Sequence, residues 1–86
     1  MKLSKDFLLH QSDDETILVP VGDASFSGIV RGNSTFGQII EYLKEDTSVE
    51  EITAKLCSIY EGSADMIRED VNAAIEKLRD IGALDE

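Results

Sequence analysis

Apolar and polar residues follow two different periods along the chain, a two-residue alternation in the first part and a helical spacing in the second. Three short runs, over residues 7–11, 16–21 and 26–31, are apolar, rich in β-branched residues or alternating, which favours strands. The middle run places three branched side chains on one face: Ile17, Val19 and Val21. Because only a few turn-forming residues separate the runs, they predict a three-stranded antiparallel meander. Residues 1–5 are expected to lie outside any regular element.

The helical part begins where the third run ends. Gly32 is expected to break the strand, and Asn33 or Ser34 offers the side-chain oxygen that caps a helix N-terminus. A first helix over about residues 34–44 follows, with apolar residues at three- and four-residue steps: Phe36, Ile39, Ile40 and Leu43. The stretch 26–43 therefore joins the predicted sheet to the predicted helices.

A second helix is predicted after a polar break. Ser48 and Glu51 have the spacing of a capping box, in which each side chain satisfies a backbone amide of the other residue. Gly62 is the expected end, since glycine accepts the positive φ that closes a helix. The apolar face of this helix is expected to comprise Val49, Ile52, Leu56, Ile59 and Tyr60.

A third helix is capped by Ser63 or Asp65 and ends at Gly82. Its apolar stripe is Ile67, Val71, Ala74, Ile75, Leu78 and Ile81. Ala83 and Leu84 follow and are expected to pack back on the core. The 86 residues thus predict one α+β domain, residues 1–86, with a winged-helix-like order of three strands and then three helices.

The charge balance narrows the function. The chain has 18 acidic and 8 basic residues, a net charge of −10, and most of the acidic excess lies in residues 41–86. A general nucleic-acid binder or a protein docked on anionic lipid needs a basic surface, so both classes are disfavoured. No apolar run approaches the roughly 20 residues of a membrane span, and no signal peptide is recognisable, which favours a soluble cytoplasmic protein.

Groups that could support catalysis are sparse. His10 is the only histidine and has no ligand partners in a recognisable spacing, so we expect an ordinary strand residue. Cys57 is the only cysteine, beside Leu56 in the second helix, and we expect a small buried hydrophobe. Adjacent acidic residues point in different directions on a helix and do not form a metal site. The sequence therefore predicts a protein without enzymatic activity, cofactor or metal.

Several segments together resemble the pyrroloquinoline quinone synthesis protein D family, which supplies recognition elements for ribosomally made, post-translationally modified peptides. The similarity runs from about residue 5 and is carried by an ordered set of features rather than one motif. These are Asn33, then Ile39, Ile40, Tyr42 and Leu43, then residues 47–52, Tyr60, Asp70 with Val71, and residues 78–84.

Two positions depart from the family pattern. The family usually has a large aliphatic residue just before the asparagine, where this chain has Gly32. It often has an aromatic residue in the middle of the first helix and another in the third, where this chain has Ile40 and Ala74. The first departure bears on how the end of the third strand packs.

The resemblance implies a binding function. Domains of this family recognise the leader segment of a precursor peptide and present it to a modifying enzyme, often a radical S-adenosylmethionine (radical SAM) enzyme. The leader is typically added as a strand beside the third strand, in a groove against the third helix. An edge strand exposes unpaired amides and carbonyls that an incoming peptide can pair with. The residues expected to supply this edge are Ser27, Gly28, Ile29, Val30 and Arg31.

The third helix is expected to supply the groove wall. One step round from its core stripe lies a second stripe with an aliphatic centre and two cations, suited to a leader with an apolar anchor flanked by acids: Arg68, Asn72, Ile75 and Arg79. The alternative interpretation is that the arginines form ordinary helix ion pairs with Glu69, Glu76 or their neighbours.

A winged-helix DNA-binding regulator is the alternative function, because the same helices could place one helix in the major groove. Glu69, Asp70 and Glu76 on the third helix would then face phosphates unfavourably. An exposed strand edge can also pair with a second copy, so either a monomer or a homodimer is compatible with the sequence.

Overall fold

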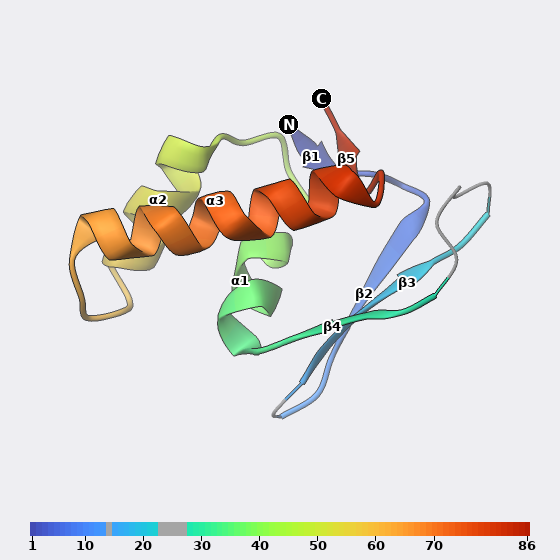
Figure 1. Cartoon of the computed structure of the whole chain (residues 1–86), viewed down its shortest axis with the longest axis horizontal. Helices are drawn as coiled ribbons and strands as arrows, with labels where there is room; N and C mark the ends of the chain where they lie inside the picture. The colour runs from blue at the N-terminus through green and yellow to red at the C-terminus, as the bar shows by residue number, and fades with distance from the viewer. Residues whose placement is uncertain (14, 23–27) are drawn as a thin grey trace.

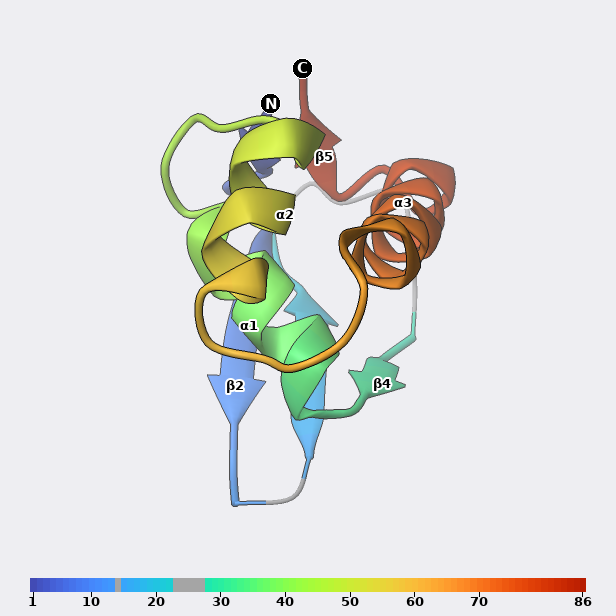
Figure 2. The same ribbon diagram turned by 90° about the vertical axis from the view of Figure 1, so that its left-hand side faces the viewer.

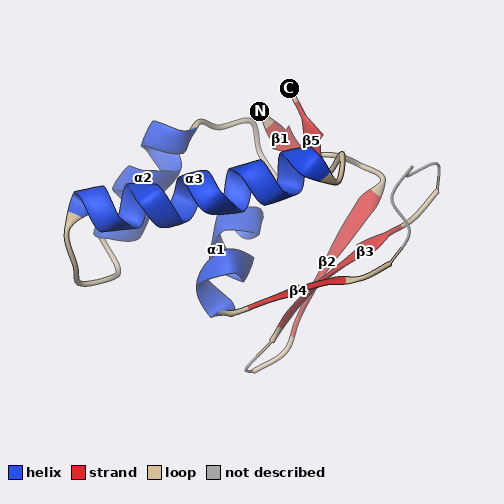
Figure 3. Ribbon diagram, in the orientation of Figure 1, coloured by secondary structure: helices blue, strands red, loops and turns tan. Residues whose placement is uncertain are grey.

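The computed structural model describes residues 1–13, 15–22 and 28–86 and has the predicted α+β architecture. Strands β2 (Phe7–Gln11), β3 (Thr16–Pro20) and β4 (Val30–Gly32) form an antiparallel sheet in the order β2-β3-β4. Figures 1 and 3 show the sheet on one side of the molecule, with the helices stacked against it. The predicted meander is therefore confirmed.

The last strand lies later in the chain than the sequence pattern indicated. Residues 26 and 27 of the predicted run are outside the described residues, and Gly28 and Ile29 precede the strand. Gly32, which was expected to break the strand, is its final residue and pairs with Thr16. The prediction was wrong here because a glycine without positive φ fits a short strand as well as a turn.

The core face of β3 is the one opposite Ile17 and Val19. Thr16 and Leu18 are 1% and 0% exposed, whereas Ile17 and Val19 are half-buried. Both faces of this strand are nearly equally apolar, so alternation alone does not reveal which one meets the helices.

A second, two-stranded sheet joins the chain ends. Strand β1 (Lys2–Leu3) pairs antiparallel with β5 (Leu84–Asp85), and the two termini lie side by side in Figures 1 and 2. The chain turns at Gly82, whose φ is 75°, and the amide of Ser4 donates to the carbonyl of Ala83 over 2.7 Å. The expectation that residues 1–5 lie outside any regular element was wrong, because their partner strand is about 80 residues away in sequence.

The three helices are α1 (Ser34–Tyr42), α2 (Val49–Cys57) and α3 (Ala64–Asp80). Each begins at a predicted cap: the side chains of Asn33, Ser48 and Ser63 accept hydrogen bonds from the amide three residues later. Helix α2 ends at Cys57, before the apolar residues Ile59 and Tyr60 that the pattern had included. The start points follow from the sequence because a cap involves only neighbouring residues.

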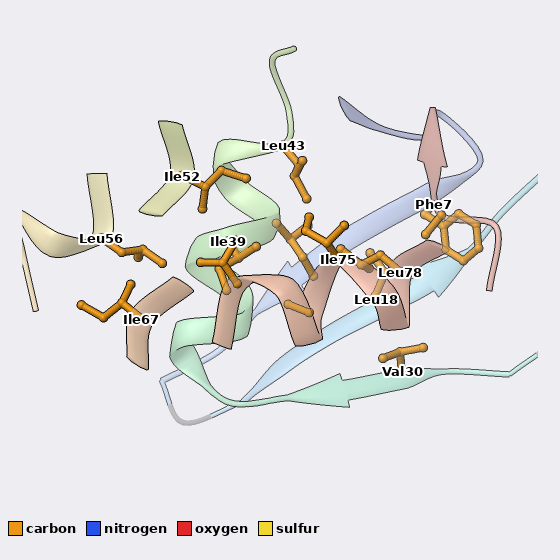
Figure 4. Close-up of a cluster of buried hydrophobic side chains, with 14 residues drawn as sticks. Phe7, Leu18, Val30, Ile39, Leu43, Ile52, Leu56, Ile67, Ile75 and Leu78 are labelled. Carbon is orange, nitrogen blue, oxygen red and sulfur yellow. The ribbon is translucent and has the colours of Figure 1, made fainter. Parts of the chain in front are cut away.

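Helix α3 is the centre of the core. It runs across α1 and α2 on one side and above β4 on the other (Figures 1 and 2). Figure 4 shows side chains from the sheet and all three helices converging on it. The buried set is Phe7, Leu18, Val30, Ile39, Ile40, Leu43, Ile52, Leu56, Ile67, Val71, Ala74, Ile75, Leu78 and Ala83. Ala83 thus packs on the core as predicted.

Helix α1 is held closely against the sheet at its first turn. The hydroxyl of Thr16 donates to the carbonyl of Asn33 over 2.9 Å, so a buried polar group fixes the helix start. A Cβ placed on Gly37 would overlap the side chains of Thr16 and Gln11. Only glycine allows this approach, and it fixes the position of α1 beside the end of β4. Among the described residues, no helix is long and apolar enough to cross a membrane.

Candidate functional site

An open groove of ≈ 360 Å³ lies between β4, the start of α1, and α3. It is lined by Arg31, Gly32, Asn33, Thr35, Phe36, Ile39, Asp70, Ala73, Ala74 and Lys77. Strand β4 is at the edge of the sheet, since among the described residues it pairs only with β3. The groove therefore combines a strand edge that no other described strand covers with a helix that faces it, as Figure 2 shows for β4 and α3.

Phe36 lies where the side chain of residue 32 would otherwise be. A Cβ on Gly32 would overlap the ring of Phe36 and would lie 2.9 Å from its Cβ. The ring of Phe36, from α1, thus occupies the place of the large aliphatic residue that is typical of this position in the family. The departure at Gly32 leaves the end of the strand packed, and it gives the groove a half-buried aromatic surface.

Two cations, Arg31 and Lys77, are among the residues that line the groove. The Nζ atom of Lys77 lies 5.6 Å from the centre of the Phe36 ring, within the range of a cation–π contact. Arg31 projects from the strand side, 67% exposed, with its guanidinium 3.5 Å from a Glu15 carboxylate oxygen. Asp70 is the one acidic residue among those lining the groove. The described lining of the groove thus has two cations and one acid, in a chain whose net charge is −10.

The predicted strand residues fall in different environments. Arg31 lines the groove, and Val30 is buried, with its side chain in the core. Gly28, with a φ of 124°, and Ile29, 56% exposed, lead into β4. Ser27 lies outside the described residues. The edge available for pairing in the described structure is thus Val30–Gly32 with the approach to it.

The predicted helix stripe does not line this groove. Ile75 is only 2% exposed and belongs to the core, so its expected place at the centre of a binding surface was wrong. Asn72 is exposed but is not among the lining residues. The α3 residues that line the groove are Asp70, Ala73, Ala74 and Lys77. The predicted stripe lies on one side of the core stripe of α3, whereas β4 lies on the other side.

Both predicted arginines of α3 are engaged in surface ion pairs. Arg68 contacts Glu50 at 3.3 Å and Asp65 at 3.4 Å. Arg79 contacts Glu76 at 2.8 Å and Glu86 at 2.9 Å. The hydrogen bonds from Arg79 lower the pKa of Glu86. These contacts match the interpretation of the arginines as ordinary ion-pair residues, each of modest energy because both partners are solvated.

Sequence reasoning missed Phe36 and Lys77 as groove residues. Phe36 was assigned to the apolar face of the first helix, and Lys77 has no distinguishing neighbour in sequence. A signal was nevertheless present. Lys77, Asp70 and Ala74 are spaced by three and four residues, so they share a face of α3.

Chemistry elsewhere in the described chain is limited. His10 is an exposed strand residue, as expected. Cys57 is exposed at the end of α2, so the expectation of a buried thiol was wrong. No group of three or more histidine, cysteine, aspartate or glutamate side chains in residues 1–13, 15–22 and 28–86 could hold a metal ion.

Comparison with known proteins gives a family and a fold. The family model described as coenzyme PQQ synthesis protein D (PqqD) matches residues 13–84. Among solved structures, TbiB1 in complex with the TbiA(beta) leader peptide has a TM-score of 0.81 at 21% identity, covering 99% of this chain and 95% of that one. Lasso peptide synthetase B1 complexed with the leader peptide has a TM-score of 0.75 at 21% identity, covering 95% and 93%. Comparison with curated proteins finds no match.

Proposed function

The chain belongs to the PqqD family, and on this premise we propose that it binds the leader segment of a ribosomally synthesised precursor peptide. It acts without catalysing a reaction itself and presents the peptide to a modifying enzyme. The observation that carries the proposal is the groove opposite α3, along the edge of β4 that has no partner strand among the described residues. The two structural relatives named above are, by their descriptions, complexes with leader peptides, which supports the same use of the fold here.

The peptide adds as a fourth strand beside β4. Backbone hydrogen bonds to the edge give affinity that does not depend on sequence, and the groove receives every second side chain. An apolar side chain fits over Phe36, whose ring is half-buried. An acidic side chain fits between Arg31 and Lys77, the two cations of the groove.

The partner enzyme follows from the family resemblance. A radical SAM enzyme is the modifying enzyme that many relatives serve, and we propose such an enzyme in the cytoplasm as the partner. The DNA-binding alternative has no support from the geometry, since the exposed surface of α3 carries Glu69, Asp70 and Glu76.

The test is an amide chemical-shift titration of labelled protein with a synthetic peptide, the leader half of a precursor encoded beside this chain. We expect shifts concentrated in residues 28–33 and 70–77. A saturating excess of peptide that shifts none of these amides would overturn the proposal. Duplex DNA serves as the comparison ligand and is expected to cause no shifts.

A matched pair of variants distinguishes the two sides of α3. Ala73→Tyr places a ring in the groove, whereas Asn72→Tyr places the same ring one residue away, outside it. Both positions are exposed, so neither change disturbs the core. We expect Ala73→Tyr to weaken leader binding at least about tenfold and Asn72→Tyr to leave it within about twofold. Equal effects would contradict the placement of the peptide.

A further inference from the structure

A second hollow of ≈ 190 Å³ adjoins the groove. It is lined by Thr35, Leu56, Tyr60, Glu61, Ile67 and Asp70. Thr35 and Asp70 line both spaces, so the hollow continues the groove past the start of α1. Figure 1 shows the path: β4 leads into α1, and beyond it lie the end of α2 and the start of α3.

One face of α3 borders the whole length of this path. Ile67, Asp70, Ala74 and Lys77 follow each other at three- and four-residue steps, which places them on one stripe. Ten residues separate the ends of the stripe, so it is roughly 15 Å long at the helical rise. An extended peptide covers that distance with about four to five residues.

The second hollow has an apolar base. Leu56 and Ile67 are buried at 1% and 9% exposure, and Tyr60 forms a wall with 39% of its surface exposed. Tyr60 can contact a ligand because α2 ends at Cys57, so the turn that contains Tyr60 lies outside the core. An apolar surface that is open and continuous with a peptide groove is suited to an anchor side chain.

We propose that the leader carries a second, apolar anchor that fills this hollow, about four to five residues along the peptide from the groove beside β4. This proposal rests on the proposed function and adds a second specificity site to it. Glu61 borders the hollow and Asp70 borders both spaces, whereas Arg31 and Lys77 border only the groove near β4. The residues around the second anchor are therefore neutral or basic, and the acidic residues of the leader lie toward β4.

The position of the anchor also reports the direction of the bound strand. The hollow lies past the C-terminal end of β4, where the chain enters α1. An antiparallel leader reaches it with residues N-terminal to the paired segment, and a parallel leader with residues C-terminal to it. Truncating the peptide from each end identifies which flank carries the anchor.

The experiment measures the affinity of the whole chain for the synthetic leader and for versions shortened by five residues at either end. Tyr60→Ala is the test variant, and Ile59→Ala is its control, because Ile59 is 57% exposed and does not line the hollow. We expect Tyr60→Ala to lower the affinity for the full leader about tenfold. The affinity for the leader that lacks the anchor flank is expected to stay unchanged. Ile59→Ala is expected to change neither of these two affinities by more than about twofold.

A second measurement does not depend on any variant folding. The full leader is expected to shift the amides of residues 56–61, and the leader lacking the anchor flank is not. If the full and both shortened leaders bind wild-type protein equally and shift only residues 28–33 and 70–77, the second anchor is refuted and the proposed function stands. If no leader binds, the proposed function is refuted as well.

Discussion

Replacing Gly32 with valine tests whether the ring of Phe36 has taken the space of the missing side chain. A Cβ at position 32 overlaps the ring and lies 2.9 Å from the Cβ of Phe36. Rotating the ring cannot relieve the second contact, because the Cβ of Phe36 is attached to the first turn of α1. The substitution must therefore displace either the ring and the helix start or the end of β4.

The magnitude follows from two opposing effects. Overpacking costs about 1–3 kcal/mol of the free energy of unfolding. Replacing a glycine inside a strand raises the free energy of unfolding by about 0.5–1 kcal/mol. The net expectation for Gly32→Val is a loss of about 0–2.5 kcal/mol, with a midpoint of about 1 kcal/mol. For a domain of this size, each kcal/mol corresponds to about 4–8 °C in melting temperature.

Urea denaturation of a double-mutant cycle provides the assay. Phe36→Ala alone is expected to destabilise the protein, because the ring is half-buried. In Gly32→Val/Phe36→Ala, the overlap with the ring is gone and only the contact between the two Cβ atoms remains. The two losses therefore do not add, and the coupling is at least about 0.5 kcal/mol. Losses that add in the double mutant, or a Gly32→Val protein more stable than wild type, would refute the reasoning.

Three further predictions concern stability and titration. Gly37→Ala is expected to lower the melting temperature although alanine favours helix by about 1 kcal/mol, because its Cβ overlaps the sheet; a higher melting temperature would contradict this. Ile75→Ala is expected to cost about 2–5 kcal/mol in urea unfolding and Asn72→Ala less than about 0.5, since only the first is buried; similar losses would be inconsistent with the assigned helix faces. Arg79→Ala is expected to raise the pKa of Glu86 toward 4.5 in an NMR titration. Because that pKa is lowered in the folded protein, the stabilisation by this pair is present above the unfolded pKa and disappears as pH falls through the folded one; an unchanged Glu86 pKa would argue against the contact.

Local features of the fold were readable from the sequence. The caps Asn33, Ser48 and Ser63 begin the three helices as predicted, because a cap is a contact between residues three positions apart. The meander was predicted from short connections between apolar runs, and the strand order confirms it although residues 21–29 separate β3 from β4. The family resemblance was also correct, and the match over residues 13–84 confirms it.

The site was only partly readable. The sequence placed a peptide groove between the third strand and the third helix, and the structure has a groove there. The α3 stripe that it selected does not line this groove: Ile75 lies in the core, whereas Ala73, two positions earlier and also apolar, lines the groove. Which of the two residues faces the core depends on where β4 and α2 pack against α3. Residues within one turn of α3 do not determine that packing.

The sequence by itself determined the periods, the caps and the charge balance, since each depends on residue type and near neighbours. Tertiary structure decided what depends on distant partners: the pairing of β1 with β5, the face of β3 that is buried, and the exposure of Cys57 and Tyr60. It also decided that the ring of Phe36 fills the space above Gly32. These outcomes follow from packing, in which a side chain occupies whatever volume its non-local neighbours leave open.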